Sequence, residues 1–253
     1  MARKCVFCGK NEVTKEHLFA RWIRETFRDP TAPKPAIAFQ RDAVQHWSYS
    51  GESVLEQTVK GFCARCNNGW MSDLEVKAGA ILQPMLKAER IGIKLGYAAQ
   101  HTVASWATKT ALVLHQLHPT EQFIPESDYR DFCRKIQPSS NVFVLMGARH
   151  IAQSTTGGSI EGNNIFEHKD GGRDFGSAKI VQVHYAIGAL YFGLIVFIKR
   201  PRRYPRAINP DAATRALVVW PVQTGDVIWP SASISDIGGV NAMFDALTSA
   251  LWG

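Results

Sequence analysis

The sequence predicts a protein of the α+β class, and three patterns lead to that prediction. Two Cys-x-x-Cys pairs, Cys5/Cys8 and Cys63/Cys66, lie far apart in the chain and suit a small compact module near the N-terminus. Apolar residues recur every three or four positions over 70–82, which is typical of an amphipathic helix. An uncharged run over 180–198, rich in Val, Ile, Tyr and Phe, is typical of buried strands.

The N-terminal elements follow from local signals. Gly9 permits the tight turn that closes a knuckle over 5–9, and mixed apolar and basic residues predict a short helix over 19–24. Prolines predict a loop over 29–35. Two strands are expected at 44–49 and 54–59, joined by a turn at 50–53, and the helix that starts near Asn67 should end or kink at Pro84.

The remaining two thirds of the chain also mix helices and strands. Apolar spacing predicts helices over 101–117, 125–136 and 239–251, and strands over 141–146, 216–220 and 226–229. A polar, Gly-rich connection covers 154–176. The run 180–198 admits two interpretations, a membrane span with a basic flank or a hairpin of two buried strands. Alternation in its first half and the glycines at 188 and 193 favour the hairpin, so no membrane association is expected.

Composition sets the broad class of the protein. With 253 residues, 45% hydrophobic and 20% charged, the chain can bury a substantial core. A net charge of +7 and a pI near 9.2 favour polyanionic partners such as nucleic acid. The N-terminal Met-Ala-Arg-Lys carries no signal-peptide pattern, so we expect a cytoplasmic protein whose cysteines bind metal and form no disulfides.

The paired spacing of four cysteines predicts one structural zinc ion. Cys5, Cys8, Cys63 and Cys66 would fill all four tetrahedral positions with sulfur, so that ion would join two distant chain segments and do no chemistry. Cys133 lies in a predicted amphipathic helix and is expected to be a buried thiol.

A Glu-His pair between the two knuckles and an Asn directly after the last cysteine add a further pattern. Together with the cysteines, Glu16-His17 and Asn67 resemble the HNH endonucleases of the ββα-metal superfamily, in their four-cysteine form. The resemblance covers about residues 1–90, so we expect a zinc-stapled HNH module there and an α+β domain over 91–253, which would position substrate or mediate assembly.

The resemblance also implies roles for individual residues. Glu16 and Asn67 would bind a catalytic Mg²⁺ or Mn²⁺ ion, and His17 would act as the general base that activates water. Either Asp73 or Glu75 could complete the metal shell, although acids at a helix start also have a structural role. The sequence departs from the family at the usual Asp, here Glu16, at the middle Asn, here Thr58, and at a Lys, here Trp70.

The expected activity is hydrolysis of phosphodiester bonds, with DNA favoured as the substrate. A basic run after the hairpin is a candidate for phosphate contacts through its five cations, Lys199, Arg200, Arg202, Arg203 and Arg206. One such site cuts one strand, so double-strand cleavage would imply a homodimer. Two alternatives remain open: a zinc-stapled nucleic-acid-binding protein that does not cleave, and an interaction protein in which the knuckles are scaffold.

Overall fold

The fold mixes helices and strands in one chain, as the α+β prediction requires. The computed structural model describes residues 4–10, 12–27, 36–40, 46–50, 56–86, 92–116, 124–149, 163–168, 178–199, 217–230 and 233–234. The predicted loop over 29–35, the terminal helix over 239–251 and the basic positions 200–206 therefore lie outside the described residues.

Helices occur close to where the sequence predicts them. Their bounds are α1 Arg21–Thr26, α2 Ala64–Cys66, α3 Ser72–Leu86, α4 Tyr97–His115 and α5 Glu126–Lys135, with a π-helical turn η2 at Asn67–Met71 between α2 and α3. Of the two outcomes predicted at Pro84, an end or a kink of the helix, the end does not occur, because α3 continues through Pro84 to Leu86. Pro84 lies in the last turn, where Met85 and Leu86 are fully buried, and this packing offsets the lost backbone hydrogen bond.

A six-stranded sheet forms the larger layer of the molecule. Its strand order is β10-β6-β9-β8-β7, and β12 pairs with β6 at a different point. The strand bounds are β6 Val142–Arg149, β7 Asn163–His168, β8 Ala178–Ile187, β9 Leu190–Lys199, β10 Leu217–Trp220 and β12 Ser233–Ile234. The predicted strands over 141–146, 180–198 and 216–220 all belong to this sheet.

The run over 180–198 is an antiparallel hairpin. β8 and β9 pair from Ile187↔Leu190 to Lys179↔Lys199. Gly188 turns the chain with a φ of +57°, and a Cβ there would lie 2.3 Å from the carbonyl oxygen of Leu86, so only glycine fits. Within the part of the chain that the structure describes, no helix has the length and apolarity to cross a bilayer.

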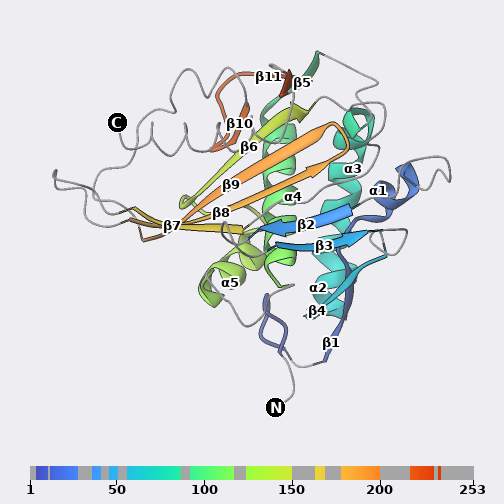
Figure 1. Ribbon diagram of the computed structural model, residues 1–253, viewed down its shortest axis with the longest axis vertical. Coiled ribbons are helices and arrows are strands. Elements are labelled where there is room, and N and C mark those ends of the chain that lie inside the picture. The colour runs from blue at the N-terminus through green and yellow to red at the C-terminus, as the bar shows by residue number, and fades with distance from the viewer. Residues whose placement is uncertain are drawn as a thin grey trace.

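Helix α4 is the centre of the core. It lies against one face of the sheet and beside α3 (Figure 1). The Trp106 ring contacts Tyr185 and Phe192 of the hairpin, and the Tyr185 hydroxyl donates to the Ala107 carbonyl at 3.0 Å. Because α4 is covered on several sides, nearly all its side chains from Val103 onward are buried.

The N-terminal region folds as an antiparallel strand pair followed by a helix. β1 Val13–His17 pairs with β4 Thr58–Cys63, and the chain then enters α2, η2 and α3. The sequence did not predict the strand at β2 Ala36–Gln40, which pairs with β3 His46–Ser50. The strands expected at 44–49 and 54–59 overlap β3 and β4, and these two strands pair with β2 and β1 respectively, not with each other.

Two further strands, β5 Ile93–Leu95 and β11 Val227–Trp229, form a separate pair at the opposite end of the molecule from β1 (Figure 1). Buried residues from Cys5 to Trp229 form a single hydrophobic cluster that includes α3 and α4. The boundary near residue 90 stays a prediction, but the apolar packing runs across it.

Candidate functional site

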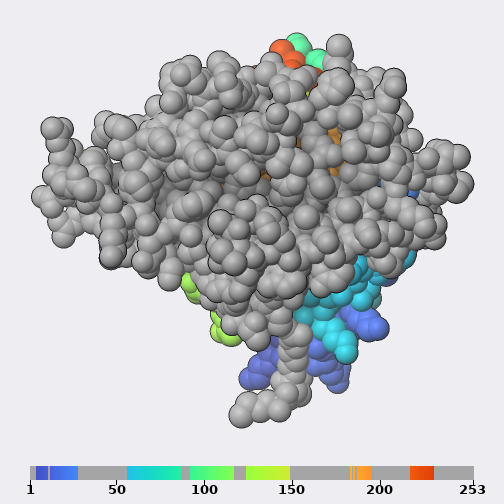
Figure 2. All heavy atoms as spheres, viewed as in Figure 1, coloured from blue at the N-terminus to red at the C-terminus, as the bar shows by residue number. Residues whose placement is uncertain are grey.

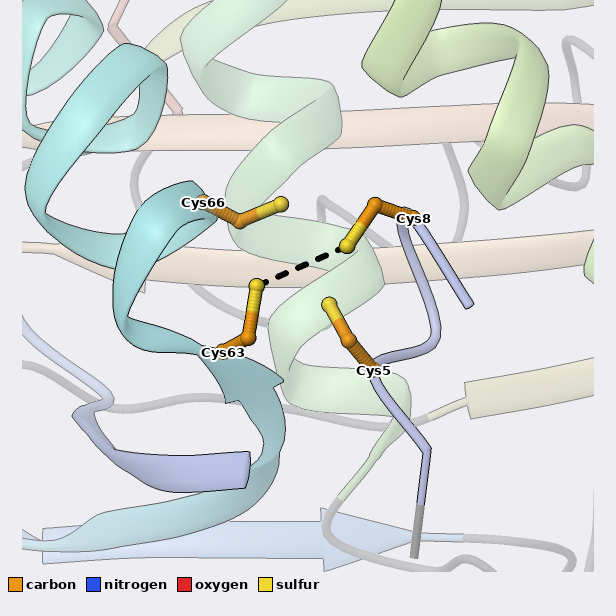
Figure 3. A group of neighbouring side chains, drawn as sticks. All are labelled: Cys5, Cys8, Cys63 and Cys66. Carbon is orange, nitrogen blue, oxygen red and sulfur yellow. Dashed lines mark hydrogen bonds between the residues drawn. The ribbon is translucent and has the colours of Figure 1, made fainter. Parts of the chain in front are cut away.

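Four cysteine side chains converge where the N-terminal turn meets the end of β4. Cys5 and Cys8 lie on the turn, Cys63 is the last residue of β4, and Cys66 ends α2. The four sulfur atoms point toward one another (Figure 3) and all lie within 4.8 Å of one another. Residues 55 positions apart are thereby neighbours, with 3.5 Å between the sulfurs of Cys8 and Cys63.

Backbone geometry preforms the first half of this cluster. Gly9 adopts a φ of +73°, and its N–H donates to the Cys5 carbonyl at 2.8 Å. The Cys5 N–H in turn donates to the Lys10 carbonyl at 2.7 Å. These bonds curl the turn so that both thiols face β4, as the predicted knuckle requires.

Burial and the neighbouring thiols shift the pKa values of three of these cysteines. Burial raises the pKa of Cys66 and of Cys8. Burial also acts on Cys63, but hydrogen bonds from the Cys66 N–H and from neighbouring thiols outweigh it and lower the Cys63 pKa to about 7. Four sulfur donors in tetrahedral reach suit a metal ion such as zinc, which would displace the remaining protons.

The fifth cysteine lies beside this cluster. Cys133 on α5 is half-buried, and burial raises its pKa while the nearby Cys66 thiol acts to lower it. It is not one of the four residues whose ligand atoms converge. The sequence analysis correctly predicted that Cys133 lies on a helix, here α5. It did not predict that Cys133 lies close to the sulfur cluster.

Aromatic rings hold the knuckle against the rest of the molecule. Phe7, between the first two cysteines, is buried and contacts Phe62, Trp70, Tyr129 and Phe132 with ring centroids 4.9 to 6.4 Å apart. Tyr129 and Phe132 belong to α5. The sulfur cluster is thus fixed between the strand pair and a helix from the later part of the chain.

Glu16 and Asn67 come together from different elements. Glu16 lies near the end of β1 and Asn67 opens η2 directly after the sulfur cluster, and the Asn67 side chain is close enough to the Glu16 carboxyl to act to lower its pKa. The amide nitrogen of Asn67 also lies 3.4 Å from the Lys15 carbonyl oxygen. The strand pair therefore brings an acid and an amide 51 positions apart to one place.

The Glu16 carboxyl titrates near neutrality. Burial raises its pKa from 4.5 to about 7; Lys109 acts to lower it and Glu75 to raise it. The carboxyl is thus close to Glu75, which the sequence analysis considered as a further metal ligand, and to Lys109, which it did not consider. A carboxyl of this kind holds a proton or a cation depending on pH.

Glu75 and Lys109 form a buried ion pair beside Glu16. The Lys109 ammonium contacts one Glu75 oxygen, and the Trp22 indole N–H lies 3.3 Å from the other. The Lys109 side chain is only 2% exposed and that of Glu75 15%. The sequence contained a signal for Lys109, since it is the one Lys, Arg, Asp or Glu between 97 and 117, on a helix whose neighbours are apolar. Asp73, the other acid considered, is exposed.

The partner of His17 is Glu56, and it differs from the residues that surround Glu16 and Asn67. Successive residues of a strand face opposite sides, and His17 is 45% exposed, whereas Glu16 points inward. Its Nε2 lies 3.5 Å from a Glu56 oxygen, and the same oxygen accepts a hydrogen bond from Arg24 at 2.7 Å. Thr58, which stands where the motif has its middle Asn, lies opposite His17 in the strand register.

Among the described residues, the four cysteines are the only group of three or more His, Cys, Asp or Glu whose ligand atoms converge. The Glu16/Asn67 pair offers two protein oxygens, which leaves the remaining positions of a hard cation to water or substrate. Lys199 ends β9, and the other four cations of the predicted basic run lie outside the described residues. Comparison with protein families, with curated proteins and with solved structures finds no match for this chain.

Proposed function

We propose that this protein is a metal-dependent endonuclease of the HNH type, which hydrolyses phosphodiester bonds in nucleic acid, with DNA as the favoured substrate. The observation that carries the proposal is the contact between Glu16 and Asn67, at the end of a strand pair that a four-cysteine cluster joins to a helix. The proximity of these two residues supports the roles that the sequence resemblance implies for them.

Phosphodiester hydrolysis needs three groups, and this region of the chain carries a candidate residue for each, although His17 lies on the opposite side of β1 from Glu16. A divalent ion provides charge stabilisation for the phosphate and the leaving oxygen, and Glu16 and Asn67 would hold it through oxygen ligands of the kind that Mg²⁺ and Mn²⁺ take. His17 would accept the proton of the attacking water. The four cysteines would bind a separate zinc ion with no open position, which serves folding alone.

Glu56 supplies an orienting group for His17 in this scheme. An imidazole that donates from Nε2 to a carboxylate keeps Nδ1 free to accept a proton. Arg24 holds the Glu56 carboxylate at 2.7 Å and so limits its movement. The pair would do the work of the motif's middle Asn, whose position Thr58 takes here.

A plasmid-cleavage assay tests the proposal. The wild type should convert supercoiled plasmid to nicked circles with Mg²⁺ or Mn²⁺, and His17→Ala should lower the rate at least 100-fold, because it removes the general base. Zinc content should be unchanged, since His17 is no ligand of the sulfur cluster. His101→Ala, which removes an imidazole on α4, is the matched control and should leave cleavage intact.

A second candidate is a nucleic-acid-binding protein that does not cleave. It is favoured by the fact that, in the described part of the chain, Glu16 belongs to no group of three or more His, Cys, Asp or Glu whose ligand atoms converge. DNA binding by a wild type that cuts no plasmid with any divalent ion would establish it. A protein that binds zinc but no nucleic acid would leave only the scaffold interpretation.

A further inference from the structure

The outer face of the β1/β4 pair presents cations next to His17. Strand alternation places four exposed side chains on this face, Lys15 and His17 from β1 and Thr58 and Lys60 from β4. In the register, His17 lies opposite Thr58 and Lys15 lies opposite Lys60. The two lysines are thus direct cross-strand neighbours, two residues along the strand from the imidazole.

A bulge creates this pairing of lysines. Thr14 pairs with Phe62, but the next residue, Lys15, pairs with Lys60, so Gly61 is the extra residue. Gly61 has a φ of 158°, a conformation that side chains with a Cβ rarely adopt. Its carbonyl accepts the Val6 N–H at 2.9 Å, so the cysteine turn holds the bulge in place.

The lysine pair is unfavourable for the folded chain alone. Like charges directly opposite each other in an antiparallel pair destabilise it. Among the ion pairs that the described residues form, none includes Lys15 or Lys60, whereas the nearby Arg24, Glu56 and His17 form a connected group. A polyanion bound across this face would offset the repulsion between the two ammonium groups.

We propose that the outer face of the β1/β4 pair binds the phosphate backbone of nucleic acid through Lys15 and Lys60, beside His17. This proposal rests on the proposed function, which it deepens by assigning the surface that receives the substrate. Lysine contacts phosphate as a point charge and reads no base, so the surface fits backbone of any sequence. Two residues along a strand span about 7 Å, which places a neighbouring phosphate within reach of the imidazole.

The β1/β4 pair that carries both lysines lies at one end of the molecule (Figure 1). Residues of the N-terminal segment and of 56–86 emerge together at the lower end of the molecule (Figure 2). The β5/β11 pair lies at the opposite end (Figure 1). Lys94 on β5 is exposed like Lys15 and Lys60, and it therefore serves as a matched control of equal charge at a distant place.

Binding of a labelled DNA duplex of arbitrary sequence tests the proposal. Fluorescence anisotropy without divalent ions measures affinity between 50 and 300 mM salt for the full-length protein. Lys15→Gln/Lys60→Gln should weaken binding about 10- to 30-fold near 150 mM salt and reduce the salt slope by about two, since two phosphate contacts are lost. Lys94→Gln should change neither quantity, and Lys15→Arg/Lys60→Arg should restore binding because it keeps both charges.

Three outcomes separate this proposal from the proposed function. A double variant with wild-type affinity and salt slope overturns the surface assignment, whatever the wild type cleaves. If the double variant binds DNA more weakly as expected but the wild type never cuts plasmid, the surface assignment stands and the nuclease proposal fails. If the wild type binds no DNA but binds vesicles rich in phosphatidylserine, and the double variant binds those vesicles more weakly, the surface is assigned to lipid. That result would overturn nucleic acid as the partner.

Discussion

In the absence of Mg²⁺ and Mn²⁺, Glu16 makes the protein less stable as pH rises. Burial raises the folded-state pKa of this carboxyl to about 7, whereas the unfolded chain keeps the ordinary value near 4.5. Between these two values the folded state binds more protons than the unfolded state, so the free energy of unfolding falls as pH increases. The loss reaches at most about 3 kcal/mol above pH 7.

Glu16→Gln should remove this dependence, because the amide stays neutral at every pH. We expect urea denaturation of the zinc-bound protein, in buffer free of Mg²⁺ and Mn²⁺, to show the variant gaining stability over wild type between pH 5 and pH 8. Glu12→Gln, at an exposed carboxylate of the same segment, should show no such gain. A gain of equal size in both variants would contradict a specific effect of burial at Glu16.

The residues of the candidate site differ in how far the sequence could predict them. The four cysteines follow from their spacing, because a tetrahedral ion fixes which side chains must meet. Glu16 and Asn67 lie close together, and the metal-binding role that the motif implies for them stays a prediction. The sequence did not indicate Glu56, because its position next to His17 depends on the ion pair between Glu56 and Arg24. It did not indicate Lys109 either, because the contact of Lys109 with Glu75 joins two different helices, α4 and α3.

Among the helices and strands, too, features set by neighbouring residues could be predicted from the sequence, whereas contacts between distant segments could not. Periodicity predicts α4 and α5 to within a few residues, because their apolar positions recur every three or four residues. Pairing partners were predicted well only for the β8/β9 hairpin, where a short turn fixes the register. β4 pairs instead with β1, more than 40 residues away, and nothing local in either strand specifies that partner.

A buried ion pair, Glu75–Lys109, links α3 to α4 in addition to their apolar contacts. Lys109→Met would leave the Glu75 carboxylate without its cation, with Glu16 close by, and should cost about 3 to 5 kcal/mol in the free energy of unfolding. Adding Glu75→Gln should recover most of that loss, because the amide oxygen can still accept from Trp22 while no charge remains buried. Chemical denaturation at pH 7 measures both values.

The control for this pair is Lys77→Met, at an exposed lysine of α3. A surface change of that kind should stay within about 0.5 kcal/mol of wild type. Losses that simply add in Lys109→Met/Glu75→Gln would show that the two residues act independently. The α3/α4 joint would then rest on its apolar contacts alone.

The molecule as a whole is held together across the predicted boundary at residue 90. Phe7 from the cysteine turn packs on Tyr129 and Phe132 of α5, and buried residues of both parts belong to one cluster. Metal binding at the four cysteines should therefore stabilise α5 as well as the strand pair. Two independent domains joined by a linker would confine that effect to residues 1–90.

Cys66→Ser tests this coupling, with Cys133→Ser as the matched control. The first variant should lose zinc, measured by elemental analysis, because it removes one of four convergent thiols, and the second should keep one zinc per chain. Hydrogen exchange should then rise in β1 and β4 of Cys66→Ser and also in α5, through the lost support for Phe7. Faster exchange that stops at residue 90 would mean that the aromatic contacts carry no coupling and that the cysteine module folds on its own.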